Sequence, residues 1–400
     1  MSVSAGRDAK EDILLELEKV ESDIVEVALE SPVQSLYGGH IRALIQRVLH
    51  ESGVTGVWIK AKDAGALDWV ILARLESGLK RLIPGFRKNL APEKVWDFRP
   101  QVPRDHMRRS RLYLPGMQPD LMTGAALFQP DGIILDLEDS VAPSEKDTAL
   151  ILVRNAILAV DFGACERMVR INPLPAGLGE LPALLDTDGV DTLLVPKAER
   201  AEEIGQLARY IREYLNRTGN ARRIWLMPIL ETAMGIWKAC EIGASCDGIC
   251  ALAFGAEDFS KDIGARRTKQ GTESFAARSM LVLGARAAGV QPIDTVFSDV
   301  DDEAGLLSST KEAIGLGFEG KGCIHPRQVR VIHDAFRPEE AEFRWAVKVK
   351  RAMDEAHAAG RGVVALGSKM IDPPVAARAL KVLKTAAFYG MVPEEGGADE

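Results

Sequence analysis

Eight short, nearly continuous apolar segments follow one another between residues 111 and 326 of the 400-residue chain. They cover residues 111–116, 132–139, 168–173, 192–197, 224–231, 250–258, 292–297 and 322–326. Such segments are typical of parallel strands that are covered on both faces. Helical segments alternate with them, so the pattern predicts an α/β fold, a closed (β/α)8 TIM barrel. An open doubly wound sheet is the alternative, but it usually has a glycine-rich turn after its first strand, and this sequence has none.

The remaining sequence divides into three further parts. Residues 1–85 combine strand-like alternation in DILLELE, DIVEVALES and TGVWIKA with helical spacing over residues 36–49 and 67–82, which predicts a small α+β domain. Residues 86–107 are rich in proline and charge and are interpreted as a linker. The barrel domain is expected over residues 108–335. Residues 336–400 are expected to form a helical extension that contains the glycine-rich segment with GSKMID.

Composition excludes several classes of protein. With 46% hydrophobic and 27% charged residues, the chain is typical of a globular protein with a large core. A net charge of −8 disfavours general binding to nucleic acid or to an anionic membrane, and no apolar run approaches the roughly 20 residues that span a bilayer. Five cysteines without a CxxC pair are expected to be reduced thiols, and no signal peptide is present. We therefore expect a cytoplasmic protein.

Polar side chains lie within or at the ends of several predicted strands, where a plain apolar core would have none. The acidic ones are Glu138, Asp139, Glu231, Glu257 and Asp258. The carboxyl ends of barrel strands form the rim where active sites lie. Carboxylates that share a rim repel each other unless a cation or hydrogen bonds compensate. The pattern therefore predicts a hard divalent ion such as Mg²⁺, held by one or two carboxylates and completed by water and substrate oxygens.

Two basic residues accompany these acids. Arg170 is expected to hold a substrate carboxylate through two parallel hydrogen bonds. Lys197 either binds substrate or neutralises the rim as a structural cation, and a Schiff-base role would be unnecessary beside a metal that can hold an enolate. Asp139 and Glu257 could instead cap the helices that follow them. The histidines are scattered and indicate no transition-metal site.

Seven motifs carry a family resemblance. RSRLYLPG, DLEDSVAPSEKD, VRINP, LVPK, ILETAMG, FGAEDFS and GKGCIHPRQ, in this order, resemble the citrate lyase β-subunit-like proteins of the HpcH/HpaI aldolase superfamily, over about residues 108–385. Residues 5–85 resemble the acyl-carrier (γ) subunit of citrate lyase, through LYGGHIRALIQRVL and KDAGALDWVILARLES. The whole chain thus resembles a fusion of the γ and β subunits.

The resemblance implies roles for the rim residues. Glu231 and Asp258 match the metal ligands, and Arg170 matches the arginine that holds the keto or hydroxy acid. Glu138 and Asp139 match positions that bind substrate through the metal's water shell.

Other implied roles lie outside this group. Arg109 and Lys146 match positions near the phosphates of the thioester cofactor. Asp372, in GSKMIDPP, matches an acid/base residue that reaches the site of a neighbouring subunit. A homo-oligomer, a trimer or a hexamer, is therefore implied.

The front domain departs from the family in one respect. In the γ subunit, a serine within a stretch resembling GTLESGD carries a covalent phosphoribosyl-dephospho-CoA arm. The matching stretch here is AGRDAKED, with Lys10 in place of that serine, and Ser4 lies six residues earlier. We therefore expect no covalent arm and expect the enzyme to use free CoA thioesters.

The resulting hypothesis is a Mg²⁺-dependent carbon–carbon lyase. It would cleave, or form by condensation, a hydroxy-acid thioester such as citryl-, malyl- or citramalyl-CoA, with acetyl-CoA and an oxo acid as the other partners. One alternative is a class II pyruvate aldolase that acts on a free hydroxy-keto acid. Another is a non-catalytic subunit of a larger lyase complex.

Overall fold

The computed structural model describes residues 2–21, 24–94, 101–358, 364–366 and 369–392. It falls into two compact units, Met1–Val329 and Arg330–Glu400. The first unit contains a small α+β domain and a barrel. The second contains two packed helices joined through a short hairpin.

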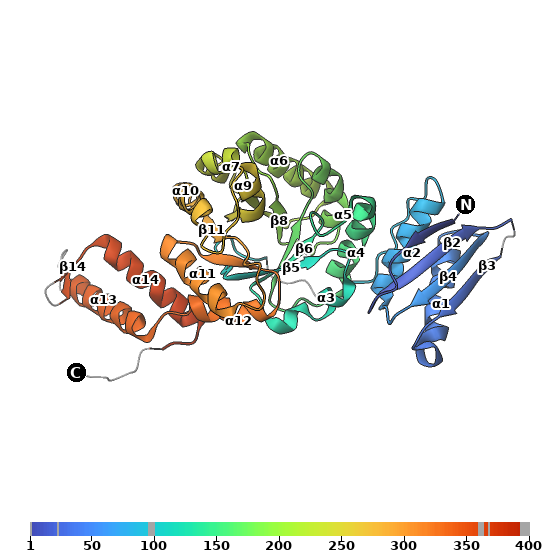
Figure 1. Cartoon of the computed structure of the whole chain (residues 1–400), viewed down its shortest axis with the longest axis horizontal. Helices are drawn as coiled ribbons and strands as arrows, with labels where there is room; N and C mark the ends of the chain where they lie inside the picture. The colour runs from blue at the N-terminus through green and yellow to red at the C-terminus, as the bar shows by residue number, and fades with distance from the viewer. Residues whose placement is uncertain (1, 22–23, 95–100, 359–363, 367–368, 393–400) are drawn as a thin grey trace. The chain divides into compact units, whose positions relative to one another are not determined.

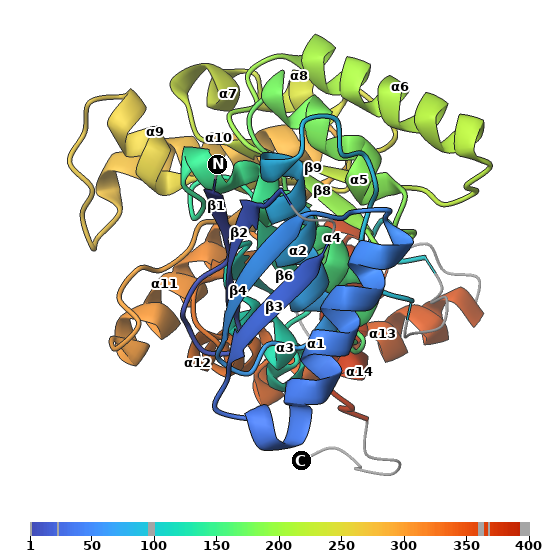
Figure 2. The same ribbon diagram turned by 90° about the vertical axis from the view of Figure 1, so that its right-hand side faces the viewer.

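The α+β domain is a four-stranded sheet with two helices. Its strands are β1 (Ser2–Ala5), β2 (Ile13–Lys19), β3 (Val25–Glu30) and β4 (Val57–Asp63), in the order β1-β2-β4-β3. Figure 2 shows these strands side by side. All neighbours are antiparallel except β3 and β4, which α1 (Gln34–Glu51) connects; α2 (Asp68–Leu82) follows β4. The predicted α+β character is confirmed, and β1, which is only four residues long, is an additional strand.

Eight parallel strands form a closed barrel, as the apolar segments predict. They are β5 (Ser110–Pro115), β6 (Gly132–Asp136), β7 (Glu166–Arg170), β8 (Thr192–Val195), β9 (Trp225–Leu230), β10 (Ala251–Phe254), β11 (Gln291–Asp294) and β12 (Gly320–Cys323). Each strand pairs with the next, and β12 pairs with β5. This last pairing closes the sheet and excludes the open doubly wound alternative.

Helices surround the strands of the barrel (Figure 1). They are α3 (Pro119–Thr123), α4 (Lys146–Ala159), α5 (Leu181–Leu185), α6 (Ala201–Thr218), α7 (Ala233–Trp237), α8 (Ala239–Gly243), α9 (Ala256–Asp262), α10 (Phe275–Ala287), α11 (Glu303–Leu316) and α12 (Arg327–Phe336). Short 3-10 turns lie at Ala125–Phe128, Pro143–Glu145, Ala176–Glu180 and Thr272–Ser274. Within the described ranges, none of the helices has the length and apolar character that crossing a bilayer requires.

Strand β5 contributes polar as well as apolar side chains to the barrel. Successive side chains of a strand point to opposite faces. The alternation places Arg111 and Tyr113 toward the interior, and both line the cavity described below. At the amino-terminal end, Arg108 pairs with Glu166 of β7 at 2.7 and 2.9 Å. Charged residues thus fill part of the space below the rim.

Buried ion pairs join the α+β domain to the barrel. Arg154 of α4 donates to Glu76 of α2 at 2.7 and 3.1 Å, and both side chains are buried. Arg74, also on α2, donates twice to Asp12 at 2.8 Å and reaches the carbonyl oxygen of Met117, in the loop after β5, at 3.3 Å. Because a buried charge without a partner is costly, these pairs hold the domain in one position on the barrel.

The second unit is built on α13 (Glu340–Ala358) and α14 (Pro373–Phe388). The strands β13 (Val364–Leu366) and β14 (Lys369–Ile371), which lie between these helices in the sequence, pair antiparallel. Ala346, Val349, Ile371 and Ala379 form its core. The helical extension is confirmed, and the glycine-rich segment that interrupts it contains this hairpin.

Replacing Glu76 tests the junction between α2 and α4. Glu76→Leu leaves Arg154 buried without its carboxylate, so the free energy of unfolding should fall by about 3–5 kcal/mol. The double variant Glu76→Leu/Arg154→Met should recover part of that loss because no unpaired charge remains. Denaturant unfolding measures both. Lys350→Ala, which breaks an exposed pair with Asp354, is the control and should change stability little. A double variant as unstable as the single one would contradict the interpretation.

Candidate functional site

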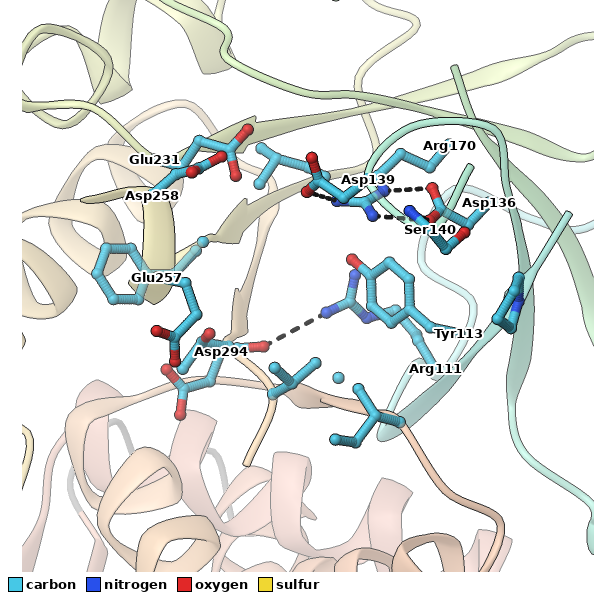
Figure 3. A pocket seen from close by; sticks show the side chains of 18 residues that line it. Arg111, Tyr113, Asp136, Asp139, Ser140, Arg170, Glu231, Glu257, Asp258 and Asp294 are labelled. Atoms are coloured by element: carbon cyan, nitrogen blue, oxygen red, sulfur yellow. Dashed lines mark hydrogen bonds and ion pairs between the residues drawn. The ribbon is translucent and has the colours of Figure 1, made fainter. Parts of the chain in front are cut away.

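A cavity of about 440 Å³ lies at the carboxyl ends of the barrel strands. Its charged lining residues are Arg111, Asp136, Asp139, Arg170, Glu231, Glu257, Asp258 and Asp294. Figure 3 shows Glu231 beside Asp258 and, across the cavity, Arg170 bonded to Asp136. The remaining lining is mostly apolar or small, including Ile229, Phe254 and Val296. The rim is therefore acidic, as the strand-end residues predict.

Arg170 is held by a carboxylate that the sequence reasoning missed. Strands β6 and β7 pair in a register that sets Asp136 directly opposite Arg170. Asp136 accepts hydrogen bonds from Nε and Nη2 of Arg170 at 2.6 and 2.8 Å. Burial alone would raise the pKa of Asp136, but the hydrogen bonds from Arg170 outweigh burial and keep that pKa below its ordinary value. Asp136 therefore stays ionised and fixes the orientation of the guanidinium.

The other edge of Arg170 faces the predicted substrate-binding acids. Its Nη1 lies 2.7 Å from Oε2 of Glu138 and 3.3 Å from Oδ2 of Asp139. Asp136 uses Nε and one hydrogen of Nη2, and Asp139 accepts one hydrogen of Nη1, so one donor on each of Nη1 and Nη2 remains for a carboxylate. Asp139 is largely exposed and does not cap α4, whose N-cap residue is Glu145.

Lys197 contacts two of the predicted acids. Its Nζ lies 2.9 Å from Oε1 of Glu138 and 3.5 Å from Oδ2 of Asp258. Burial would lower the pKa of Lys197, but the hydrogen bond to Glu138 and the nearby negative charges raise it above its ordinary value. Burial also raises the pKa of Glu138, in spite of Arg170 and Lys197. A protonated amine is a poor nucleophile, so the geometry favours a neutralising role over Schiff-base chemistry.

The backbone of Lys197 also positions Glu231. Lys197 has a positive φ of 52°, a region that L residues seldom adopt. In this conformation its N–H donates to Oε1 of Glu231 at 2.8 Å. On the opposite side, a Cβ at Gly255 would lie 2.4 Å from Oε2 of Glu231, so only glycine leaves room for this carboxylate. The strained backbone of Lys197 and the absence of a side chain at Gly255 therefore both fix the position of the Glu231 carboxylate.

Glu231 and Asp258 form the pair that fits a divalent cation. Glu231 follows β9 and is 5% exposed, whereas Asp258 lies in the first turn of α9 and is more accessible. Burial, together with the charges of Glu138 and Asp258, raises the pKa of Glu231 to about 8. A cation between the two carboxylates would remove that penalty. Over the described residues, no cluster of three or more potential metal ligands occurs, so water and substrate oxygens would complete the coordination of Mg²⁺.

Glu257 lies apart from this pair. Its side chain is mostly exposed, and Oε1 lies 3.3 Å from Nε of Arg267. It does not cap α9, whose N-cap residue is Gly255. Figure 3 shows the carboxylate of Glu257 apart from those of Glu231 and Asp258.

Two residues with implied cofactor roles have structural partners. Arg109 precedes β5 and donates through Nε and Nη2 to Asp131, at 2.8 and 2.7 Å, at the end of the barrel opposite the cavity. Lys146 begins α4, and its Nζ donates to the carbonyl oxygens of Leu137 and Glu138, which stabilises the loop that carries Glu138. The structure does not bring Arg109 together with the rim residues. Binding of thioester phosphates by either residue stays a prediction.

Asp372 belongs to the second compact unit. It is exposed and forms the N-cap of α14, where its Oδ1 accepts a hydrogen bond from the N–H of Val375 at 3.0 Å. Its acid/base role stays a prediction.

Two further lining residues were missed because they lie inside an apolar strand. Arg111 and Tyr113 alternate with leucines in RLYLPG, and an arginine at the start of such a segment was the available signal. The ring of Tyr113 lies under Arg170, whose Cζ is 5.3 Å from the ring centroid.

The chain matches two family models. The model described as "Malonate decarboxylase delta subunit (MdcD)" matches residues 1–82, in agreement with the expected acyl-carrier-like domain. The model described as "HpcH/HpaI aldolase/citrate lyase" matches residues 109–326.

Individual relatives agree with the second model. Citrate lyase subunit beta of Leuconostoc mesenteroides subsp. cremoris is 35% identical over 73% of this chain and 97% of its own. Mitochondrial citramalyl-CoA lyase of Homo sapiens is 34% identical over 70% and 85%. The crystal structure of CitE from Mycobacterium tuberculosis in complex with magnesium, acetoacetate and coenzyme A has a TM-score of 0.56 and 30% identity, covering 70% of this chain and 98% of that one. The chain therefore belongs to the HpcH/HpaI aldolase/citrate lyase family.

Proposed function

We propose that the protein is a Mg²⁺-dependent carbon–carbon lyase that cleaves a hydroxy-acid CoA thioester of the citryl, malyl or citramalyl type into acetyl-CoA and an oxo acid. The observation that carries the proposal is the buried Glu231 beside Asp258, in the same cavity as the Arg170–Asp136 pair. The relatives named as lyases and the related structure titled with magnesium and coenzyme A support it.

The residues at the rim have different roles in such a reaction. When bound by Glu231 and Asp258, Mg²⁺ supplies a Lewis acid that stabilises negative charge on substrate oxygens. Arg170 holds the carboxylate of the substrate through Nη1 and Nη2, while Asp136 prevents rotation of the guanidinium. Lys197 balances the charge of Glu138 and Asp258 and orients Glu231 through its backbone.

Asp372 is proposed as the acid that protonates the enolate left on the thioester, and as the base in the reverse condensation. The role rests on the resemblance of GSKMIDPP to the family motif, which also implies that Asp372 serves a neighbouring subunit. A homo-oligomer, a trimer or a hexamer, and a cytoplasmic location belong to the same proposal.

The front domain is proposed to act without a covalent arm. Lys10 lies in the exposed loop between β1 and β2, and its amine is 3.3 Å from Oε1 of Glu11. The phosphoribosyl-dephospho-CoA arm of the γ subunit is attached to a serine hydroxyl, and the amine of Lys10 does not provide that group. The buried pairs of α2 with α4 support a fixed structural role for the domain.

The alternatives make different products. A class II pyruvate aldolase would release pyruvate from a free hydroxy-keto acid, whereas the proposed lyase releases acetyl-CoA. Assays for both products from the same purified protein separate the two enzymes. A non-catalytic subunit would release neither, and the complete set of rim carboxylates argues against it.

Removal of a metal ligand tests the catalytic centre. Glu231→Ala and Asp258→Ala should each abolish Mg²⁺ binding and turnover of a panel of citryl-, malyl- and citramalyl-CoA, since a site of two carboxylates cannot spare one. The melting temperature should not fall, because removing either acid relieves repulsion at the rim. Glu257→Ala, on the same rim, is the matched control and should stay near wild type. Full activity of the wild type in excess EDTA would contradict the metal assignment.

Replacement of Arg170 by lysine tests the carboxylate grip. A point charge cannot reproduce the planar fork that binds both Asp136 and substrate. We expect kcat/KM to fall about 10²-fold or more, roughly 3 kcal/mol of transition-state stabilisation. Arg267→Lys, at a half-buried position beside Glu257, is the control and should have little effect. Near-normal efficiency of Arg170→Lys would mean that Arg170 is structural.

Mixing two inactive variants tests Asp372. Asp372→Ala and Glu231→Ala should each be nearly inactive alone. Mixed oligomers should regain activity, because some sites then combine an intact barrel with an intact Asp372 from another subunit. Activity after subunit exchange, with exchange verified by mass spectrometry, is the measurement. Absence of complementation in verified mixed oligomers would contradict a shared site.

A further inference from the structure

Arg111 is a buried cation that the proposed mechanism does not use. It is the second residue of β5, is 1% exposed and lines the cavity below Tyr113. Nη1 lies 3.1 Å from the sulfur of Met227, and Nη2 lies 3.4 Å from the backbone oxygen of Asp294. Within the described chain, Nε is buried without a hydrogen-bond partner. These are weak contacts for a guanidinium with five donors.

Other buried arginines of the first unit each bond to a carboxylate. Arg108 is paired with Glu166, Arg154 with Glu76 and Arg278 with Asp294. Two of these acids have further partners, since Asp294 also binds Lys321 and Glu166 also accepts from Thr192. No such ion pair is found for Arg111 in the described residues. Burying a charge without a counter-ion is costly, so a simple filling role for this side chain is unfavourable.

The position of Arg111 indicates which part of a substrate could be that counter-ion. Arg111, Tyr113 and Pro115 all line the cavity from one face of β5, and Arg111 starts furthest from the rim, about 13 Å along the strand from Pro115. Glu231, Asp258 and Arg170 occupy the rim. The long CoA chain has to leave the cavity at the rim. The part of the substrate that reaches the bottom of the cavity, here called the floor, where Arg111 lies, therefore belongs to the oxo-acid half.

Basic side chains are few in the described lining of the cavity. Arg170 and Arg111 are the basic side chains among the described cavity-lining residues, and Ile229, Phe254, Val296 and Ile324 supply apolar surface. A methyl group, as in a pyruvate-derived substrate, would be accommodated by that apolar surface alone. A carboxylate would bind the unused donors of Arg111 and neutralise its charge.

We propose that Arg111 is a specificity-determining residue that binds a second carboxylate on the oxo-acid half of the substrate. The enzyme then selects a dicarboxylic 2-oxo acid of the oxaloacetate type over a monocarboxylic one of the pyruvate type. The inference rests on the proposed lyase function and names its substrate class.

Competing acceptors test the inference in the direction of condensation. The full-length protein with Mg²⁺ and acetyl-CoA is given oxaloacetate or pyruvate, and kcat/KM is measured for each. The wild type should favour oxaloacetate by on the order of 10²-fold, because an unfilled site for a charged group discriminates strongly. Arg111→Met, which keeps the length of the side chain, should lower the ratio of the two efficiencies by a similar factor. Arg111→Lys, which keeps the charge, should lie between them.

Controls separate specificity from structure. Arg267→Met removes a cation near the rim and should leave the ratio unchanged. The melting temperature of Arg111→Met without ligand should equal or exceed that of the wild type, since an unpaired buried charge is lost. A clear fall in melting temperature with an unchanged ratio would mean that Arg111 is structural, and would overturn the inference.

Calorimetry separates this inference from the lyase proposal. Binding of oxaloacetate and of pyruvate, each with Mg²⁺, is measured without acetyl-CoA. If no thioester is made or cleaved but oxaloacetate still binds more tightly in a manner that depends on Arg111, the lyase proposal fails and the assignment of Arg111 stands. If the wild type binds or uses both acids equally well, or if Arg111→Met weakens both equally, the assignment of Arg111 fails whatever the outcome for the lyase.

Discussion

Closure of the parallel sheet is the constraint on which the site depends. Hydrogen bonds between β12 and β5 complete the ring, so the carboxyl ends of all eight strands meet around one opening. Residues from Arg111 to Ile324, more than 200 positions apart in the chain, thereby line one cavity. Burying polar groups at this end is unfavourable. Apolar side chains deeper in the barrel, such as Met168 and Ile293, pack against each other and offset that unfavourable free energy.

The opening concentrates negative charge, and the protein balances it in two ways. Pairing within the chain balances part of it: Asp136 is neutralised by Arg170, and Glu138 by Arg170 and Lys197. Glu231 is left buried with a pKa of about 8, beside Asp258. Within the described residues, one backbone N–H, that of Lys197, donates to this carboxylate, so a bound cation would compensate its unfavourable position. The bottom of the cavity shows the opposite imbalance, because Arg111 has no carboxylate partner among the described residues.

Buried charge also governs the junction between the front domain and the barrel. The sheet of that domain has its own apolar core, yet α2 carries Glu76 and Arg74 into contact with α4 and with the loop after β5. Arg7 of the loop between β1 and β2 also donates to the carbonyl oxygen of Met117. The loop in which Lys10 lies is thus tied to the loop that follows the first barrel strand. A domain held in this way is suited to a fixed role in the fold.

The sequence by itself determined the architecture and most of the rim. Apolar periodicity is a local property, so the eight strands, the α+β domain and the helical extension could be predicted, and residues at strand ends such as Glu231 and Asp258 could be expected to share one rim. Pairing between segments is not local. Only the tertiary structure decided that the register of β6 and β7 sets Asp136 against Arg170, and that Lys197 takes a left-handed conformation that orients Glu231. It also placed Arg109 against Asp131 at the far end of the barrel and left Arg111 unpaired at the floor, because the partner of a charge depends on which distant strands closure brings together.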